Sequence, residues 1–351
     1  MKTLLLLAFA ALACAPPTPA TRVGQCNYVR GGAPGAACCT GCGSELWCNT
    51  ASCTCEDITD PCGATTDGGT VSSGTPDAGV VPTGTVDADG GTVDRLWFAT
   101  TGDTRPGNCD QTGAYPQFAI TQVAQGMKAL RVQFALDLGD HMYVCNGNDA
   151  EAQTQMGYYM TAIAQGPSTF WMTMGNHECG NNTYPYSCFT TAAHDANFSA
   201  YMSALKRPLP YYSADVQTSL GKARFVIIAD DSWNAAQASW LESTLADADL
   251  HAKYTIIARH HPVQGSRTGN PDILTALQKH KYTMILTAHD HSYSHDTSSW
   301  NSRSAVVGIG GAGGGIPGFG TVLQNLDGTL TFVERDANGN PLGQPWSVAP
   351  Q

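Results

Sequence analysis

The chain has 351 residues, too many for one small domain and enough for a large core with additional segments. Its formal net charge is −11. This acidity argues against a general nucleic-acid binder, because such proteins neutralise phosphates with a basic surface.

The N-terminus has the pattern of an export signal. The apolar run 4–13 follows a short start and precedes Cys14, and it is too short to span a bilayer as a helix. Small residues before Cys14 are similar to a bacterial lipobox, in which the cysteine is lipidated after cleavage. We therefore predict a signal peptide at 1–21 and favour a lipid anchor at Cys14 over plain cleavage near Ala13 or Ala20. The expected location is the bacterial cell surface, as an outer-membrane lipoprotein, or the extracellular space.

Residues 22–64 hold eight of the thirteen cysteines and few aliphatic residues. Such a segment cannot build a large core, so it is predicted to be a small disulfide module. The spacing of Cys39 and Cys42 also suits zinc, a weaker alternative in an exported chain. Residues 65–94 are rich in Gly, Thr and Asp and are predicted to form a disordered linker.

From residue 95 to 351 the sequence consists of short apolar runs that alternate with segments of helical periodicity. Strands are predicted at 96–100, 132–136, 169–174, 225–229, 254–258 and 282–286. Helices are predicted at 118–130, 149–164, 194–205 and 237–245, and a β-rich tail follows at 305–333. Strands that alternate with helices predict an α/β domain, with two packed sheets between helices.

Polar residues of the types that bind metals stand at the ends of five of these apolar runs. They are Asp103, Asp140, Asn176 with His177, His260, and the pair His289 and His291. In open α/β sheets, ligands bind beyond the carboxyl ends of the strands. Carboxylates, imidazoles and one amide together suit zinc, iron or manganese.

The five blocks resemble, in order, those of the calcineurin-like metallophosphoesterases, and within them the purple acid phosphatase-like branch. The blocks begin at Gly102, Gly139, Gly175, Ile257 and Ala288, and the resemblance covers about 95–335. It implies a four-layer α/β/β/α sandwich. It also implies two metal ions, iron paired with zinc, manganese or iron.

By position, the resemblance assigns two ligand sets that share a bridging Asp140. The first ligand set is Asp103, Asp140, Tyr143 and His291. The second ligand set is Asp140, Asn176, His260 and His289. Two ions held in this way activate water as a hydroxide nucleophile and polarise the phosphoryl group. A tyrosinate ligand at Tyr143 favours ferric iron and a purple colour; the alternative is an aromatic pocket wall beside zinc or manganese.

Two further residues are candidate catalytic residues. His177 follows a ligand, so the resemblance implies that it protonates the leaving alkoxide or stabilises the transition state; a structural hydrogen bond is the alternative. Arg105 stands where many relatives have histidine and purple phosphatases often have glycine. It either forks onto a substrate phosphate oxygen or makes a salt bridge at the rim. Ala288 also replaces a usual glycine, while His141 and His261 match no ligand position.

Four late cysteines flank the metal blocks, and we predict the pairs Cys109–Cys145 and Cys179–Cys188, which would hold the ligand loops. A glycine run at 310–315 is expected to line the pocket floor.

The leading function is an exported phosphatase that hydrolyses small phosphate monoesters. A phosphodiesterase acting on nucleotides or lipid headgroups is the second possibility, and a non-catalytic surface metal-binding protein is the third.

Overall fold

The computed structural model describes residues 28–30, 47–49, 54–56, 81–179, 192–263, 271–295 and 318–351. The chain divides into two compact units, Met1–Val71 and Ser72–Gln351. In the first unit, three short strands form an antiparallel sheet: β1 (Tyr28–Arg30), β2 (Trp47–Asn49) and β3 (Thr54–Glu56). The signal peptide with Cys14 lies outside the described residues, and the pairing of the module's cysteines stays a prediction.

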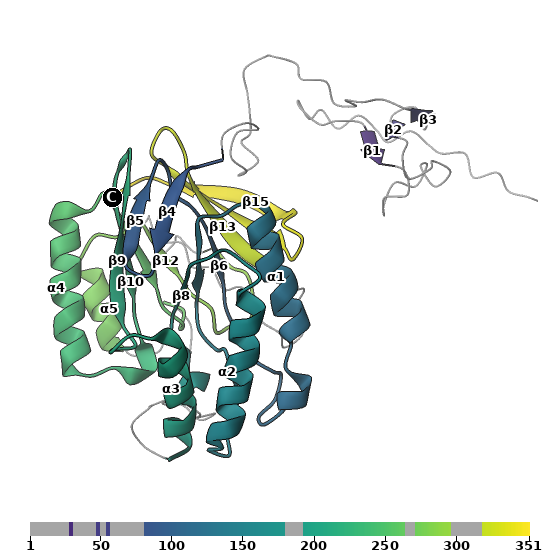
Figure 1. The fold of residues 1–351 in the computed structure, drawn as a ribbon. Coiled ribbons are helices and arrows are strands. Elements are labelled where there is room, and N and C mark those ends of the chain that lie inside the picture. The colour runs from purple at the N-terminus through teal and green to yellow at the C-terminus, as the bar shows by residue number, and fades with distance from the viewer. Residues whose placement is uncertain are drawn as a thin grey trace, which may run out of the picture. The chain divides into compact units, whose positions relative to one another are not determined.

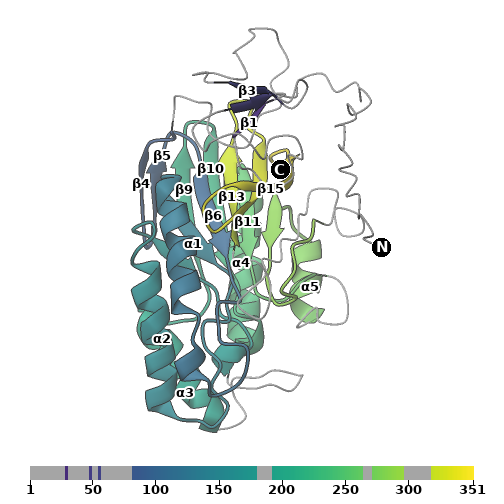
Figure 2. The ribbon, with the colours of Figure 1, turned by 90° about the vertical axis from the view of Figure 1, so that its right-hand side faces the viewer.

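The second unit contains two six-stranded sheets (Figures 1 and 2). The first sheet has the order β15-β14-β13-β6-β7-β8. Its strands are β6 (Trp97–Thr101), β7 (Phe134–Asp137), β8 (Phe170–Met172), β13 (Gly318–Gln324), β14 (Leu330–Asp336) and β15 (Pro341–Val348). The second sheet has the order β12-β11-β10-β9-β5-β4. Its strands are β4 (Gly84–Asp87), β5 (Gly90–Val93), β9 (Tyr212–Thr218), β10 (Gly221–Ile227), β11 (Tyr254–Ala258) and β12 (Met284–Leu286).

Helices cover the outer faces of both sheets. The helices are α1 (Gln117–Ala129), α2 (Asp149–Ile163), α3 (Ala192–Leu205), α4 (Ala235–His251) and α5 (Pro271–Gln278). Met127 of α1 packs with Trp97 of the first sheet, while Leu241 of α4 packs with Val226 of the second. The predicted four-layer α/β/β/α sandwich is therefore confirmed, with α1 and α2 on one side and α4 and α5 on the other (Figure 1). None of the helices in the described ranges is both long and apolar enough to cross a membrane.

The strands with continuous apolar runs are buried on both faces. In β10, Phe225 packs in the core between the sheets, and its neighbour Val226 packs in the core beneath α4 and α5. β6 divides in the same way, because Phe98 faces the other sheet and Trp97 faces α1. The rings of Phe98 and Phe225 meet edge to face, 5.3 Å apart between centroids. Sheet packing, which brings the strand ends together, therefore follows from these apolar runs.

The predicted linker is wrong at its C-terminal end. β4 and β5 form a hairpin, and β5 pairs in parallel with β9. Val86 and Val93 are buried in the core between the sheets. The glycines that suggested flexibility instead permit close approach, because a Cβ atom on Gly90 would lie 2.1 Å from the Asp215 carbonyl oxygen. The fold of the second unit thus begins before residue 95.

Element boundaries differ from the prediction in other places. Neither α5 nor β9 was predicted. α4 runs on to His251, six residues past the predicted end. The tail strand predicted near 305–307 and the glycine run at 310–315 lie outside the described residues.

Candidate metal centre

The predicted ligands lie at the ends of parallel, neighbouring strands in both sheets. The first sheet supplies oxygen ligands after β6, β7 and β8: Asp103, Asp140 and Asn176. The second sheet supplies imidazoles after β11 and β12: His260, His289 and His291. We call these groups the oxygen half and the nitrogen half. Because carboxyl ends of parallel neighbours share one edge, each half is assembled by its own sheet.

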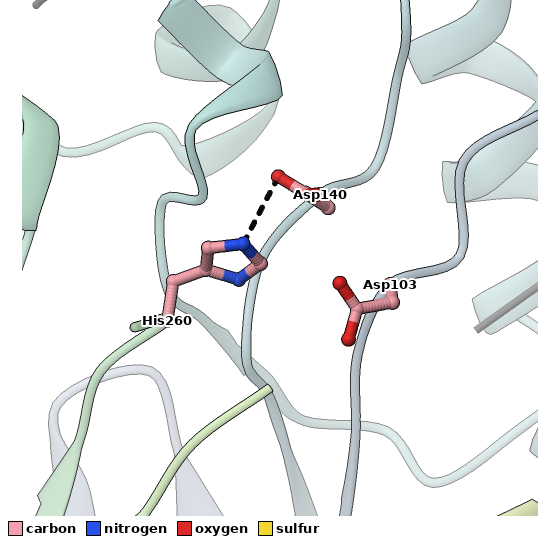
Figure 3. Close-up of side chains that lie close together, drawn as sticks. All are labelled: Asp103, Asp140 and His260. Carbon is pink, nitrogen blue, oxygen red and sulfur yellow. Dashed lines mark ion pairs between the residues drawn. The ribbon is translucent and has the colours of Figure 1, made fainter. Parts of the chain in front are cut away.

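The two halves meet at Asp103, Asp140 and His260 (Figure 3). One ligand atom from each lies within 4.8 Å of the others. His260 Nε2 points at Asp140 and lies 3.3 Å from its Oδ1. All three side chains are buried. Two carboxylates and an imidazole that converge in a buried space form a donor set suited to zinc, iron or manganese.

Asn176 and His289 extend this cluster. Asn176 Oδ1 lies 3.1 Å from His260 Nε2 and 2.9 Å from His289 Nδ1. The two ring nitrogens are themselves 3.1 Å apart. An amide oxygen and two imidazole nitrogens thus converge on one small volume beside the Asp140 carboxylate. The structure therefore brings three members of the second ligand set together, and one of them, His260, also contacts Asp140.

His291 and Asp103 lie together at the other side of Asp140. His291 Nε2 is 3.4 Å from Asp103 Oδ1. Asp103 Oδ2 also accepts a hydrogen bond of 2.9 Å from the backbone N–H of His289. Asp103 therefore fixes the last loop of the second sheet as well as facing the predicted first ligand set. His291 is less enclosed than the other ligands, with 30 % of its side chain exposed.

Four of the predicted ligands have left-handed backbone conformations. Their φ angles are 54° for Asp103, 64° for Asp140, 72° for His289 and 52° for His291. Non-glycine residues rarely adopt this region, and such strain concentrates at functional sites. Glycine is needed at Gly175, where a Cβ atom would lie 2.3 Å from Asp140 Oδ1.

The tautomer of His260 follows from its contacts. Its Nδ1 lies 2.8 Å from the Leu138 carbonyl oxygen, an acceptor, so Nδ1 carries hydrogen and Nε2 faces the ligand cluster. Burial alone would lower the pKa of His260, but the Asp140 carboxylate raises it to about 10. Either a proton or a metal ion on Nε2 compensates the carboxylate. Metal ligation therefore requires that this proton be released.

Asp140 is the hub of the centre. Besides His260, its carboxylate contacts Arg105 Nε at 3.2 Å and His177 Nε2 at 3.6 Å. It also accepts the backbone N–H of His177 at 3.0 Å. Burial acts to raise the pKa of Asp140, but His260, His177 and Arg105 hold it well below its usual value. An ionised carboxylate at this position suits a residue that faces cationic side chains or a metal ion.

His177 faces the centre but is a neutral imidazole. Burial lowers its pKa to about 4, although Asp140 acts in the opposite direction. Its ring lies edge-on against Tyr143, with 4.0 Å between the ring centroids. The predicted catalytic side chain is thus placed beside the ligand cluster, where a neutral ring offers one N–H donor.

Glu178 has a structural role that the sequence did not reveal. Its carboxylate accepts backbone N–H groups from Gly175 at 2.6 Å, Asp140 at 3.0 Å and His141 at 2.7 Å. It also lies 3.1 Å from His141 Nδ1. One buried side chain therefore holds the loops after β7 and β8 together. The only available signal was its place directly after His177 in the third block.

His141 links Glu178 to a second buried carboxylate. Its Nε2 lies 2.8 Å from Asp137 Oδ1, and Asp137 Oδ2 accepts a hydrogen bond of 2.7 Å from Tyr159. Burial would lower the pKa of His141, but Asp137 and Glu178 raise it to about 10. His141 is therefore an imidazolium between two carboxylates. As predicted, it lies outside the ligand sets.

Arg105 and Tyr143 lie together against the first ligand set. The Arg105 guanidinium stacks over the Tyr143 ring at 4.6 Å from the centroid. One of its terminal nitrogens lies 3.5 Å from His291 Nε2. The side chain is only 13 % exposed. Arg105 therefore makes a salt bridge with Asp140 and is largely buried. The alternative role, binding a substrate phosphate oxygen, stays a prediction.

Nearby buried groups support the loops of the second sheet. His261 Nε2 lies 3.1 Å from Asp231 Oδ2, and Arg259 binds Asp230 with two nitrogens, at 2.9 and 3.1 Å. His261 therefore contacts the loop after β10, and its ring also lies against that of His289, with 4.4 Å between the centroids. The methyl group of Ala288 faces Gly102, where a Cβ atom would lie 3.0 Å from it, so this substitution is accommodated.

The predicted disulfide Cys109–Cys145 is confirmed. It joins the loop after β6 to the loop after β7, the two loops that carry Asp103 and Asp140. Cys179 is also disulfide-bonded. Its predicted partner Cys188 lies outside the described residues, so that pair stays a prediction.

Comparison with protein families gives a match that spans the whole centre. The family model for the calcineurin-like phosphoesterases matches residues 97–293. This range contains every predicted ligand and both candidate catalytic residues. A search of curated protein sequences found no match.

Solved structures with the same fold include two phosphatases. A dimetal phosphatase from Danio rerio is 14 % identical, with a TM-score of 0.51 over 73 % of this chain and 99 % of that one. The purple acid phosphatase PPD1 from yellow lupin seeds is 15 % identical, with a TM-score of 0.53 over 75 % of this chain and 55 % of that one. At these identities the likeness concerns the fold alone.

Proposed function

This chain belongs to the calcineurin-like phosphoesterases, and from that premise we propose that it hydrolyses small phosphate monoesters at a metal centre. The observation that carries the proposal is the convergence of Asn176, His260 and His289 beside the Asp140 carboxylate. The similarity of the fold to two phosphatases supports the same reading. Bound metal ions would supply Lewis-acid chemistry, which activates water and polarises phosphoryl oxygens.

The chain's own groups would divide the remaining work. The negative charge of Asp140 would hold cationic groups on both of its sides, since one oxygen faces Arg105 and the other faces His260. His177, as a neutral imidazole, would donate its single N–H to the phosphate or to the leaving oxygen. This hydrogen bond would stabilise the negative charge that develops there. Arg105 would bind a phosphate oxygen through its forked N–H groups.

Hydrolysis of two model esters tests the proposal. Purified chain is stripped with a chelator, reloaded with Mn²⁺ or Zn²⁺, and assayed with p-nitrophenyl phosphate and bis-p-nitrophenyl phosphate. We expect faster hydrolysis of the monoester, and a loss in His260→Ala that His251→Ala, a change at an exposed histidine, does not reproduce. Faster hydrolysis of the diester would instead indicate a phosphodiesterase. No hydrolysis of either ester would favour a metal-binding protein.

We also propose that the protein is exported and anchored through a lipidated Cys14. The apolar run before Cys14 supports export, and the Cys109–Cys145 disulfide suits an oxidising compartment. In cells that carry the full chain, Cys14→Ser should move the protein from the membrane fraction to the soluble exported fraction. Unchanged membrane association, or retention in the cytoplasm, would contradict this proposal.

A further inference from the structure

Arg105 lies among the members of the first ligand set. Its Nε is 3.2 Å from Asp140 Oδ2, and a terminal nitrogen is 3.5 Å from His291 Nε2. Its guanidinium carbon lies 4.6 Å from the centroid of the Tyr143 ring. Arg105 therefore contacts three of the four members of that set. A hydrogen bond of 3.0 Å to the Pro106 carbonyl oxygen fixes its other terminal nitrogen.

The second ligand set has a different arrangement. Asn176, His260 and His289 approach one another through one oxygen and two nitrogen atoms within about 3 Å, as the distances above show. These are atoms that can donate electron pairs to a metal ion. Arg105 contacts the other carboxylate oxygen of Asp140, Oδ2, whereas His260 contacts Oδ1. Asp140 thus presents Oδ2 to the Arg105 guanidinium and Oδ1 to the group of metal-binding atoms around His260.

A guanidinium and a metal ion are alternatives at the first position. Guanidinium remains protonated at all ordinary pH values and has no lone pair for a metal. An ion bound by Asp140 Oδ2 and His291 Nε2 would have to displace Arg105 from both atoms, and the two positive charges would repel at short range in a buried site.

We propose that Arg105 replaces the first metal ion with a fixed positive charge. The chain then holds one tightly bound ion, in the second ligand set, and Arg105 is the second cationic group that meets a phosphate. Tyr143 is consequently the aromatic platform beneath the guanidinium and not a tyrosinate ligand. The role toward phosphate rests on the proposed function, whereas the number of bound ions does not.

Metal stoichiometry tests this proposal independently of hydrolysis. Stripped full-length chain is loaded with Mn²⁺, dialysed and measured for Mn²⁺ per chain, with calorimetric titration as a second readout. We expect about one ion per chain for the wild type and for Arg105→Lys, which keeps the charge. We expect about two for Arg105→His, which supplies an imidazole ligand, and the electron paramagnetic resonance spectrum of this variant should show coupled Mn²⁺ pairs.

Matched ligand variants separate the two sets in the same assay. His291→Ala should leave the wild-type stoichiometry unchanged, whereas His289→Ala should abolish tight binding. Melting temperatures confirm that each variant is folded before it is counted. About two ions in the wild type, with coupled spectra, would overturn the proposal even if the chain hydrolyses phosphate esters. One ion in a wild type that hydrolyses neither ester would refute the proposed function and leave this inference standing.

Discussion

The oxygen half and the nitrogen half of the centre are held in place in different ways. Asp140 and the loop of Asn176 are fixed by Glu178, which binds backbone N–H groups of both loops. The nitrogen half depends on contacts that cross between the sheets: His260 donates to Leu138 of the first sheet, and the His289 N–H donates to Asp103. The first sheet therefore positions the imidazoles of the second. Substitutions in the oxygen half should consequently lower metal affinity and activity more than substitutions in the nitrogen half.

The largest effect is expected from Asp140→Asn, because Asp140 contacts groups of both halves. The variant keeps the shape of the side chain but removes the charge that compensates His260 and Arg105. We expect kcat/KM for p-nitrophenyl phosphate to fall by roughly 10³-fold or more, together with loss of tight metal binding. Asp149→Asn, at an exposed carboxylate, is the control. Near wild-type turnover in the variant would show that Asp140 is not part of the metal centre.

Glu178→Gln should have the next largest effect. Its amide has one oxygen in place of two, so at least one backbone N–H loses its acceptor, and the His141 imidazolium loses a charged partner. We expect metal affinity to fall by about 10- to 100-fold, as for other supporting residues of metal sites. Calorimetric titration measures this, with the exposed Glu242→Gln as control. Unchanged affinity would show that the oxygen half does not depend on Glu178.

Tyr159→Phe probes the outer end of the same network. The substitution deletes the hydroxyl that donates to Asp137 Oδ2, and hydrogen bonds to charged groups contribute about 1.5–3 kcal/mol. We expect a loss of stability of that size in denaturant unfolding and a smaller change in metal affinity than Glu178→Gln causes. Tyr158→Phe, on the exposed face of α2, serves for comparison. A larger loss of metal affinity than in Glu178→Gln would contradict this order.

The smallest effect is expected from Arg224→Met, in the second sheet outside the metal centre. Arg224 binds Asp215 at 2.7 Å and also forms an ion pair with Asp247. Partial burial acts to raise the pKa of Asp215, but the Arg224 hydrogen bond and charge lower it overall. Because the folded pKa is depressed, this stabilisation is present at neutral pH and is lost as the pH falls through the folded pKa.

The expected loss of unfolding free energy in Arg224→Met is about 0.2–1 kcal/mol at pH 7, because the pair is partly exposed. The difference from wild type should vanish in acid, and metal affinity should not change. A stability difference that persists below the pKa values of both Asp215 and Asp247 would show that Arg224 acts through packing and not through charge.

The sequence was sufficient to predict the two packed sheets and to place the candidate ligands at the ends of their strands. Apolar runs such as 254–258 are buried on both faces, so their ends could be located and the polar residues beyond them identified. The hairpin of β4 and β5 could not be found in this way, because its glycines are required by close backbone contact with β9 and not by flexibility. Glu178 was missed for a related reason: most of its partners are backbone N–H groups, which leave no pattern in the side chains.

The position of the Arg105 side chain could not be predicted from the sequence pattern. Its position in the first block marked a departure from the relatives that the chain resembles, but the sequence left open whether the side chain lies at the rim or at the substrate. Only the contacts with Asp140 Oδ2 and His291 place it inside the first ligand set. The reason is physical, since the direction of a long side chain depends on the charges that surround it after folding.

Anomalous scattering from crystals of the full chain soaked in Mn²⁺ or Zn²⁺ tests the central claim most directly. The junction of the two sheets should show a strong peak about 2.0–2.6 Å from Asp140 Oδ1, Asn176 Oδ1, His260 Nε2 and His289 Nδ1. The guanidinium of Arg105 should remain on the other side of Asp140. The absence of a peak at this junction, or a peak bound elsewhere on the chain, would contradict a metal centre built from the two sheets.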